Sequence, residues 1–158
     1  MKLSMPQKAI TSISGQVDEI FMEVQSYLKK NTTLICALVI LALCAYGFEL
    51  FNFNLTIDEE LHATYSGPVF GWIEEGRWGM YLLNKFVIPY TVMPFVPLFI
   101  ALAFHVCAIL LMLAAWQVTN IHDQIIVGAV SITFPIMAYM YMFSTINYGI
   151  GIGLFCVA

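Results

Sequence analysis

Three consecutive acidic residues, Asp58, Glu59 and Glu60, follow directly after a long apolar run in the stretch NLTIDEELHATYSG. A carboxylate in such a place can act as a general base that takes a proton from an attacking hydroxyl group. The same acids can simply begin a helix. Thr56 and Glu59 fit the capping-box pattern, and acidic side chains in a first turn suit the helix dipole. Spacing alone leaves both interpretations open.

Cationic and aromatic side chains follow in the stretch GPVFGWIEEGRWGMYLLNKFVIPY. Arg77 carries a planar guanidinium group that suits phosphate, and Lys85 is a second cation. Trp72 and Trp78 could stack on a sugar ring, although tryptophan is also a common anchor at membrane surfaces. A surface ion pair with a neighbouring glutamate is the alternative interpretation of Arg77.

The elements that must position these residues follow from a very apolar composition. The chain has 158 residues, of which 61% are hydrophobic and 10% are charged. Because soluble domains carry roughly a quarter charged residues, this chain lacks the polar side chains needed to cover a surface in water. A lipid bilayer is therefore the expected solvent. Nucleic acid is not an expected partner, because the sequence has no basic patch interleaved with aromatic residues.

The apolar residues gather in runs, and crossing the hydrocarbon of a bilayer takes about 20 residues in a helix. The runs that are long enough are residues 33–53, 93–116 and 125–143. Pro135 predicts a kink in the third run. A fourth run begins near residue 148, and only about eleven residues of it precede the end of the sequence. We therefore expect an all-α integral membrane protein with three complete spans and the start of a fourth, as the N-terminal part of a longer polytopic chain.

Residues 1–31 form a polar leader. Its apolar residues recur mostly at steps of three or four, which places them on one face of a helix. They are Ile10, Ile13, Val17, Ile20, Phe21, Val24 and Leu28. We expect an amphipathic helix on the membrane surface, with a loosely ordered leader as the alternative. The predicted domains are this leader and a transmembrane domain at residues 32–158.

The placement of Lys and Arg predicts the orientation. The leader carries four lysines, whereas the loop at residues 54–92 carries only Arg77 and Lys85 beside five acids. The leader is therefore expected in the cytoplasm and the 54–92 loop on the extracytoplasmic side. The aromatic and charged residues of this loop favour short helices in the plane of the membrane interface. His122 and Asp123 would then form a solvated turn in a cytoplasmic loop.

Polar and sulfur-containing residues also occur within the spans. His105 lies mid-span, where ionisable residues are often functional, but a neutral, hydrogen-bonded histidine between helices is the simpler interpretation. The cysteines lie in apolar runs without metal-binding spacing, which predicts small apolar residues in helices. They are Cys36, Cys44, Cys107 and Cys156.

The stretch TIDEE after the first predicted span, followed by WIEEGRWGMYLL, resembles the membrane glucosyltransferases that bacteriophages and bacteria use to modify O-antigen and change serotype. More broadly, the layout is similar to the GT-C class of polytopic glycosyltransferases, which take sugar from a polyprenyl-phosphate carrier. The sequence-specific part of the resemblance covers residues 56–60 and 72–79. Members are several times larger, with further helices and loops that shape the acceptor site.

The resemblance implies transfer of glucose, or a related hexose, from a polyprenyl-phosphate carrier to the O-antigen of lipopolysaccharide in a bacterial inner membrane. It points to Asp58 as the catalytic base, with Glu59 as the next candidate. The residues it implies for substrate binding are Arg77, Trp78, Lys85 and Glu60. The acids could also supply oxygen ligands to a divalent metal, but this one cluster predicts neither a metal site nor a cofactor.

Two other classes of function remain as alternatives. A fragment of a transporter or flippase would have polar residues along its spans and glycine-broken helices, and only the stretch NYGIGIG fits that pattern. A non-catalytic, truncated membrane protein is the second alternative.

Overall fold

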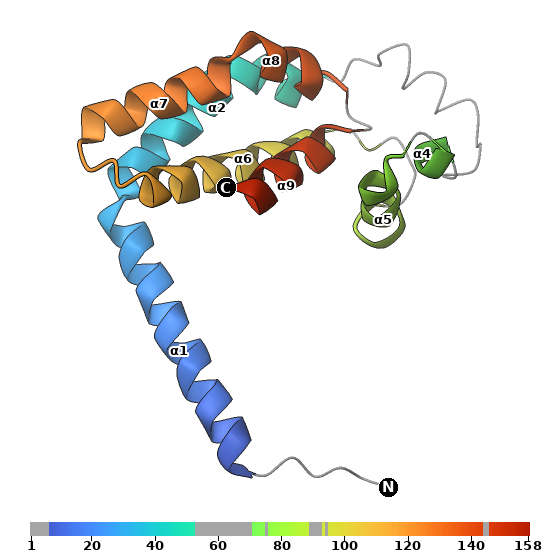
Figure 1. Cartoon of the computed structure of the whole chain (residues 1–158). Helices are drawn as coiled ribbons and strands as arrows, with labels where there is room; N and C mark the ends of the chain where they lie inside the picture. The colour runs from blue at the N-terminus through green and yellow to red at the C-terminus, as the bar shows by residue number, and fades with distance from the viewer. Residues whose placement is uncertain (1–6, 53–70, 75, 89–92, 94, 144–145) are drawn as a thin grey trace, which may run out of the picture. The chain divides into compact units, whose positions relative to one another are not determined.

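The computed structural model describes residues 7–52, 71–74, 76–88, 93, 95–143 and 146–158. Within these residues, every secondary-structure element is a helix, and turns or short loops connect the helices. In chain order, the helices are α1 (Gln7–Lys30), α2 (Thr32–Phe51), α4 (Gly71–Glu74), α5 (Trp78–Phe86), α6 (Val96–Ala115), α7 (Ile121–Thr133), α8 (Pro135–Tyr141) and α9 (Asn147–Val157). Figure 1 shows them in this order from blue to red. The predicted all-α class is confirmed.

The chain divides into two compact units, residues 1–36 and residues 37–158. The first unit contains α1, in which Val17, Ile20, Phe21 and Val24 are all exposed. Lys29 and Lys30 lie in its last turn, where positive charge suits the helix dipole. A helix with an exposed apolar stripe agrees with the predicted amphipathic leader, and its position on a membrane stays a prediction.

Two of the described helices, α2 and α6, are long and apolar enough to cross a membrane, each with 20 residues. The helices α7 and α8 pass the same test together, although they are bent by 49° at a break between them. The number of candidate spans is therefore two, or three if the bent pair counts as one. These helices lie within the three predicted runs, apart from a few residues at the ends.

The break between α7 and α8 occurs at a proline, as the sequence predicts. Phe134 is extended, with φ −60° and ψ 127°, and Pro135 is the first residue of α8. A residue before proline disfavours the helical conformation, and proline itself suits a first helical position. The extended backbone interrupts the hydrogen-bond ladder near Ile132, whose carbonyl accepts a 2.6 Å hydrogen bond from the Tyr46 hydroxyl of α2. A side chain of the neighbouring helix α2 thus provides a hydrogen bond to a carbonyl group at the break.

A buried polar group joins α6 to the bent pair. His105 is 2% exposed. Its Nε2 lies 3.0 Å from Ser131 Oγ of α7, and its Nδ1 lies 2.9 Å from the hydroxyl oxygen of Tyr141 on α8. Both ring nitrogens are therefore partnered within the helix bundle. The predicted hydrogen-bonded histidine between helices is confirmed.

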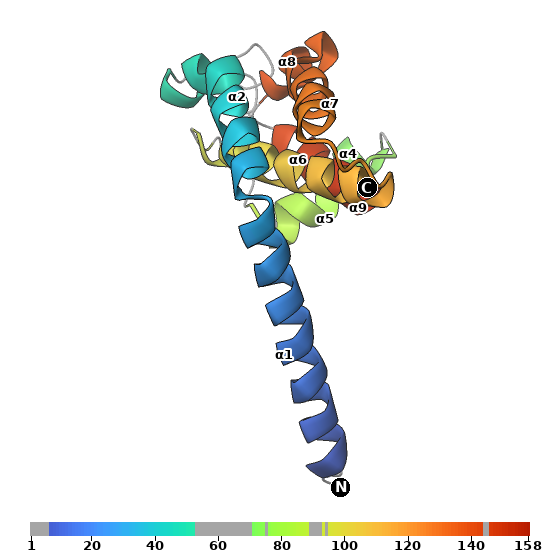
Figure 2. The ribbon, with the colours of Figure 1, turned by 90° about the vertical axis from the view of Figure 1, so that its left-hand side faces the viewer.

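Glycines allow close helix packing around α6. Figures 1 and 2 show α6 and α9 side by side. A Cβ atom at Gly151 of α9 would lie 2.6 Å from the Ala101 Cα atom of α6, so the two backbones meet without a side chain between them. The stretch NYGIGIG does not break the helix, because α9 runs continuously from Asn147 to Val157. The one stretch that fitted the glycine-broken helices of a transporter is therefore a continuous helix.

Candidate functional site

The residues with chemical potential in the first loop are organised by a turn at the end of α4. Gly76 has a φ of 76°, a conformation that glycine adopts without steric cost. The Gly76 N–H donates to the Ile73 carbonyl at 3.0 Å, and the Arg77 N–H donates to the Trp72 carbonyl at 2.6 Å. These are the two hydrogen bonds of a Schellman motif. The turn ends α4 and returns the chain towards Trp72.

The same turn places the Arg77 side chain on an aromatic ring. The Arg77 Cζ atom lies 5.5 Å from the centroid of the Trp72 ring, and such a cation–π contact at an exposed site is worth about 0.5–1 kcal/mol. Trp72 is buried, with 9% of its surface exposed, and its Nε1 has no hydrogen-bond partner. The buried ring of Trp72 therefore provides a surface on which the Arg77 side chain lies.

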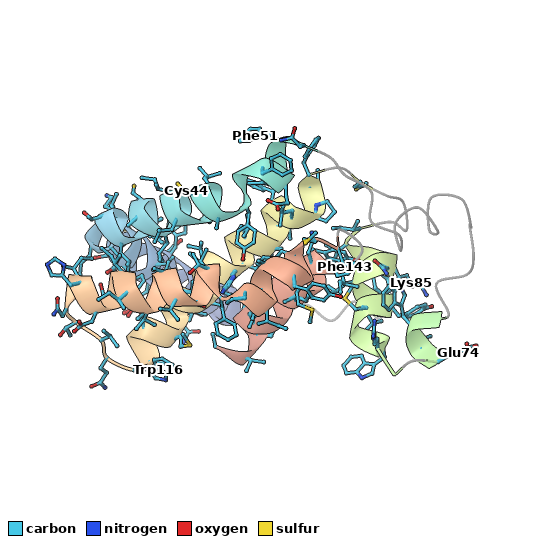
Figure 3. All side chains as sticks on the ribbon, turned by 90° about the horizontal axis from the view of Figure 1, so that it is seen from above. Cys44, Phe51, Glu74, Lys85, Trp116 and Phe143 are labelled. Carbon is cyan, nitrogen blue, oxygen red and sulfur yellow. The ribbon has the colours of Figure 1, made fainter. Side chains whose placement is uncertain are left out.

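Helix α5 has two chemically different faces. Trp78, Tyr81 and Lys85 share one face because they are three, four or seven residues apart. Trp78 is 68% exposed, and the Lys85 Nζ lies 5.7 Å from the centroid of the Tyr81 ring. Figure 3 labels Lys85 on this helix and Glu74 on neighbouring α4. The outer face of α5 thus combines a cation with aromatic rings.

The inner face of α5 packs against the start of α9. A Cβ atom at Gly149 would lie 3.0 Å from Met80 Cε and 3.6 Å from Leu83 Cδ1. The Tyr148 hydroxyl donates a hydrogen bond to Asn84 Oδ1. Asn84 and Tyr148 are 6% and 1% exposed. The apolar helix α9 therefore fixes α5 through one glycine contact and one buried hydrogen bond.

These features lie at one end of the helices, which we call the first-loop end. Chain order places there the last residues of α2 and α8 and the first residues of α6 and α9. In Figure 3, Lys85 and Phe143 lie towards this end, and Trp116 lies at the opposite end. The outer face of α5 and the Arg77 turn are thus grouped at the first-loop end of the apolar helices.

The family model described as glucosyl transferase GtrII matches residues 47–158. The chain belongs to this glucosyltransferase family. The match begins at Gly47 on α2 and covers all the helices from α4 to α9. No curated protein and no solved structure matches the chain. The resemblance found in the sequence is confirmed at the level of the family, and the chemistry of the family is glucosyl transfer.

Several residues predicted for this glucosyltransferase occupy the described part of the first loop. Arg77, Trp78 and Lys85 follow one another along the Arg77 turn and the outer face of α5. Asp58, Glu59 and Glu60 lie outside the described residues, so their roles and their relation to Arg77 stay predictions. Among the described residues, no group of three or more His, Cys, Asp and Glu side chains could hold a metal ion.

Sequence reasoning about this glucosyltransferase missed three residues at the junction of α5 and α9. They are Asn84, Asn147 and Tyr148, all at least nine-tenths buried. The sequence did hint at two of these residues. Asn84 interrupts the apolar stretch MYLLNKF, and Asn147 stands just before the glycines of NYGIGIG. Polar residues next to membrane helices are commonly paired or functional. The sequence could not predict that Tyr148 contacts Asn84, because the two residues are 64 positions apart.

Proposed function

We propose that this glucosyltransferase transfers glucose from a polyprenyl-phosphate carrier to the O-antigen of lipopolysaccharide. The reaction would take place at the extracytoplasmic face of a bacterial inner membrane. The observation that carries the proposal is the grouping of Arg77, Trp78 and Lys85 at the first-loop end of the helices. A phosphate on a membrane lipid lies at the depth where such cations and aromatic rings meet the interface.

The proposed chemistry assigns a role to each predicted residue. The acceptor hydroxyl attacks the anomeric carbon of glucose, and its proton passes to Asp58 as general base, with Glu59 as the second candidate. The bond between the anomeric carbon and the phosphate oxygen breaks, and the carrier phosphate leaves. Arg77 binds this phosphate through its planar group, with Lys85 as a second cation.

The remaining assignments concern binding and topology. Trp78 and Glu60 would contact the sugars, Trp78 by stacking and Glu60 by hydrogen bonding. The leader at residues 1–31 would lie in the cytoplasm, and the transmembrane domain at residues 32–158 would cross the membrane several times. The lysines of the leader support this orientation, because positive charge is enriched in cytoplasmic segments.

An Asp58→Asn variant tests the catalytic assignment. Asparagine keeps the size and most hydrogen bonding of the side chain but cannot take up the proton, so transfer should fall by about 100-fold or more. Transfer is measured as radiolabelled glucose that passes from glucosyl polyprenyl phosphate into lipopolysaccharide, in membranes of cells that express the protein from its own gene.

The control is Asp123→Asn, which makes the same change at the start of α7 and should leave the rate unchanged. Immunoblots of the membrane fraction establish that both variants insert normally. Full activity of Asp58→Asn would reduce Asp58 to a residue that begins a helix.

A further inference from the structure

Two asparagine side chains at the junction of α5 and α9 each have a buried atom without a partner. Asn147 is 1% exposed and Asn84 is 6% exposed. The Asn147 Oδ1 and the Asn84 Nδ2 have no hydrogen-bond partner. Nearly all buried polar atoms in proteins are hydrogen-bonded, so two exceptions at one junction need an explanation. We call this junction, formed by Asn84, Asn147 and Tyr148, the α5–α9 seam.

The unpaired atoms do not depend on which way the amides are turned. The Asn147 Nδ2 faces the Tyr141 carbonyl oxygen at 3.4 Å, and because a carbonyl only accepts, the Asn147 oxygen must be the atom left over. A tyrosine hydroxyl can donate or accept, so Tyr148 could bond either atom of the Asn84 amide. In both orientations of Asn84, one amide atom stays without a partner.

We propose that the α5–α9 seam binds hydroxyl groups of the sugar on the glycosyl donor. A sugar hydroxyl both donates and accepts, so the hydroxyls of a sugar can satisfy both an amide oxygen and an amide nitrogen. Asn84, Asn147 and Tyr148 are neutral polar residues, which suits an uncharged sugar better than a phosphate. The inference rests on the proposed function for the identity of the donor.

The seam complements the cationic side of the same short helix. Lys85 and Trp78 lie on the outer face of α5, whereas Asn84 lies on its inner face towards α9. A donor with a neutral sugar and an anionic phosphate needs both kinds of surface. Because the amides are buried, the sugar enters by separating α5 from α9, which breaks the Tyr148 hydrogen bond and the contact of Met80 with Gly149.

Lipid binding by the full chain in nanodiscs tests the seam. Quenching of tryptophan fluorescence gives the dissociation constants for glucosyl undecaprenyl phosphate and for undecaprenyl phosphate without the sugar. Each of Asn84→Leu and Asn147→Leu should weaken binding of the glucosylated lipid about tenfold, as expected for the loss of one hydrogen bond. Binding of the sugar-free lipid should stay within about twofold of the wild type.

Asn52→Leu is the matched control, because Asn52 is an exposed amide just beyond the end of α2 and should affect neither lipid. Thermal unfolding without lipid provides a second measurement. Asn147→Leu removes a buried amide oxygen that has no partner, together with one long hydrogen bond to the Tyr141 carbonyl, so its midpoint should stay close to that of the wild type. A residue with a purely structural role would lower the midpoint.

The outcomes separate the seam from the proposed donor. If the wild type prefers the glucosylated lipid and both seam variants lose that preference, the seam binds the sugar. If the wild type prefers it and the variants keep the preference, the seam inference is overturned while the proposed function stands. Equal weakening of both lipids also overturns the seam. If the wild type does not distinguish the lipids, the proposed donor fails and the seam inference fails with it.

Discussion

At the scale of single residues, Arg77 is positioned by the ring of Trp72. The Arg77 Cζ atom lies 5.5 Å from the centroid of the Trp72 ring, and a guanidinium group that stacks on an aromatic ring can still bind phosphate through the N–H groups at its edge. Gly76 is the source of this geometry, because its positive φ turns the chain back onto the ring.

The residue-scale prediction concerns the shape of this cation. Arg77→Lys keeps the charge but loses the planar fork and its stacking, so kcat/KM for glucosyl transfer should fall about tenfold, which corresponds to about 1.4 kcal/mol. Lys85→Arg is the reciprocal control, since Lys85 makes its contacts as a point charge, and a change of less than about threefold is expected. An unaffected rate in Arg77→Lys would return Arg77 to a surface ion pair.

Sequence could single out candidate residues by type, and their chemical roles stay predictions, whereas it could not predict how these residues are held in place. Arg77, Trp78 and Lys85 were identifiable by type, because few charged side chains occur in such an apolar chain. The support of Arg77 by Trp72 was not, because it depends on the left-handed conformation of Gly76. Asn84 was overlooked for a similar reason, since its burial depends on Tyr148, far along the chain.

At the scale of elements, α9 uses each glycine differently. Gly149 meets Met80 and Leu83 of α5, Gly151 meets the backbone of α6, and Gly153 has no atom within 4 Å of the position of a Cβ. Two glycines of this short helix thus allow close packing against two different helices, α5 and α6. In lipid, where apolar burial no longer drives helices together, such close backbone approach is a main source of association.

The contrast between two of these glycines gives the element-scale prediction. In Gly151→Ala the new Cβ would approach the Ala101 Cα atom at 2.6 Å and the Ala101 carbonyl carbon at 2.9 Å. The backbones must separate, and the free energy of unfolding should fall by about 1–3 kcal/mol. Thermal unfolding in detergent, followed by circular dichroism, measures the change. Gly153→Ala is the matched control and should unfold at or slightly above the wild-type temperature, because alanine favours a helix more than glycine does. Equal midpoints for both variants would contradict the packing of α6 on α9.

Hydropathy predicted the long elements well and the short ones poorly. The predicted spans at 33–53 and 93–116 contain nearly all of α2 and α6, because length and apolarity alone define such helices. Pro135 marked the break in the third span through its own backbone chemistry. The contacts of α5 with α9 were out of reach, because Gly149 and Met80 reveal their fit only when the two helices are brought together.

At the scale of the whole molecule, the chain presents an apolar exterior that suits lipid. Large apolar side chains remain exposed along the candidate spans, among them Ile40 on α2, Phe99 on α6 and Val130 on α7. The native cysteines are exposed too, on α2, α6 and α9. His105, which is buried between helices, is instead paired with Ser131 and Tyr141. This distribution is the inverse of that in a soluble domain.

The whole-molecule prediction concerns orientation. In a variant whose four native cysteines are replaced by alanine, a single cysteine in Lys85→Cys should react with a membrane-impermeant maleimide in intact cells. A single cysteine in Thr119→Cys, between α6 and α7, should react only after the inner membrane is permeabilised. The lysine-rich leader determines this outcome. The reverse labelling pattern would place the first loop in the cytoplasm and would contradict transfer from a lipid-linked donor at the extracytoplasmic face.

The hydrogen bonds at the break between α7 and α8 imply an order of assembly. Tyr46 and His105 are synthesised before Ser131, Ile132 and Tyr141, to which they are bonded. A broken helix is poorly tolerated in hydrocarbon until other groups bond its exposed carbonyls. Tyr46 and His105 are therefore already synthesised when the bent pair α7–α8, which they bond, emerges from the ribosome. During synthesis, α2 and α6 can insert into the bilayer first. The bent pair can then form its hydrogen bonds with them as it leaves the translocation channel.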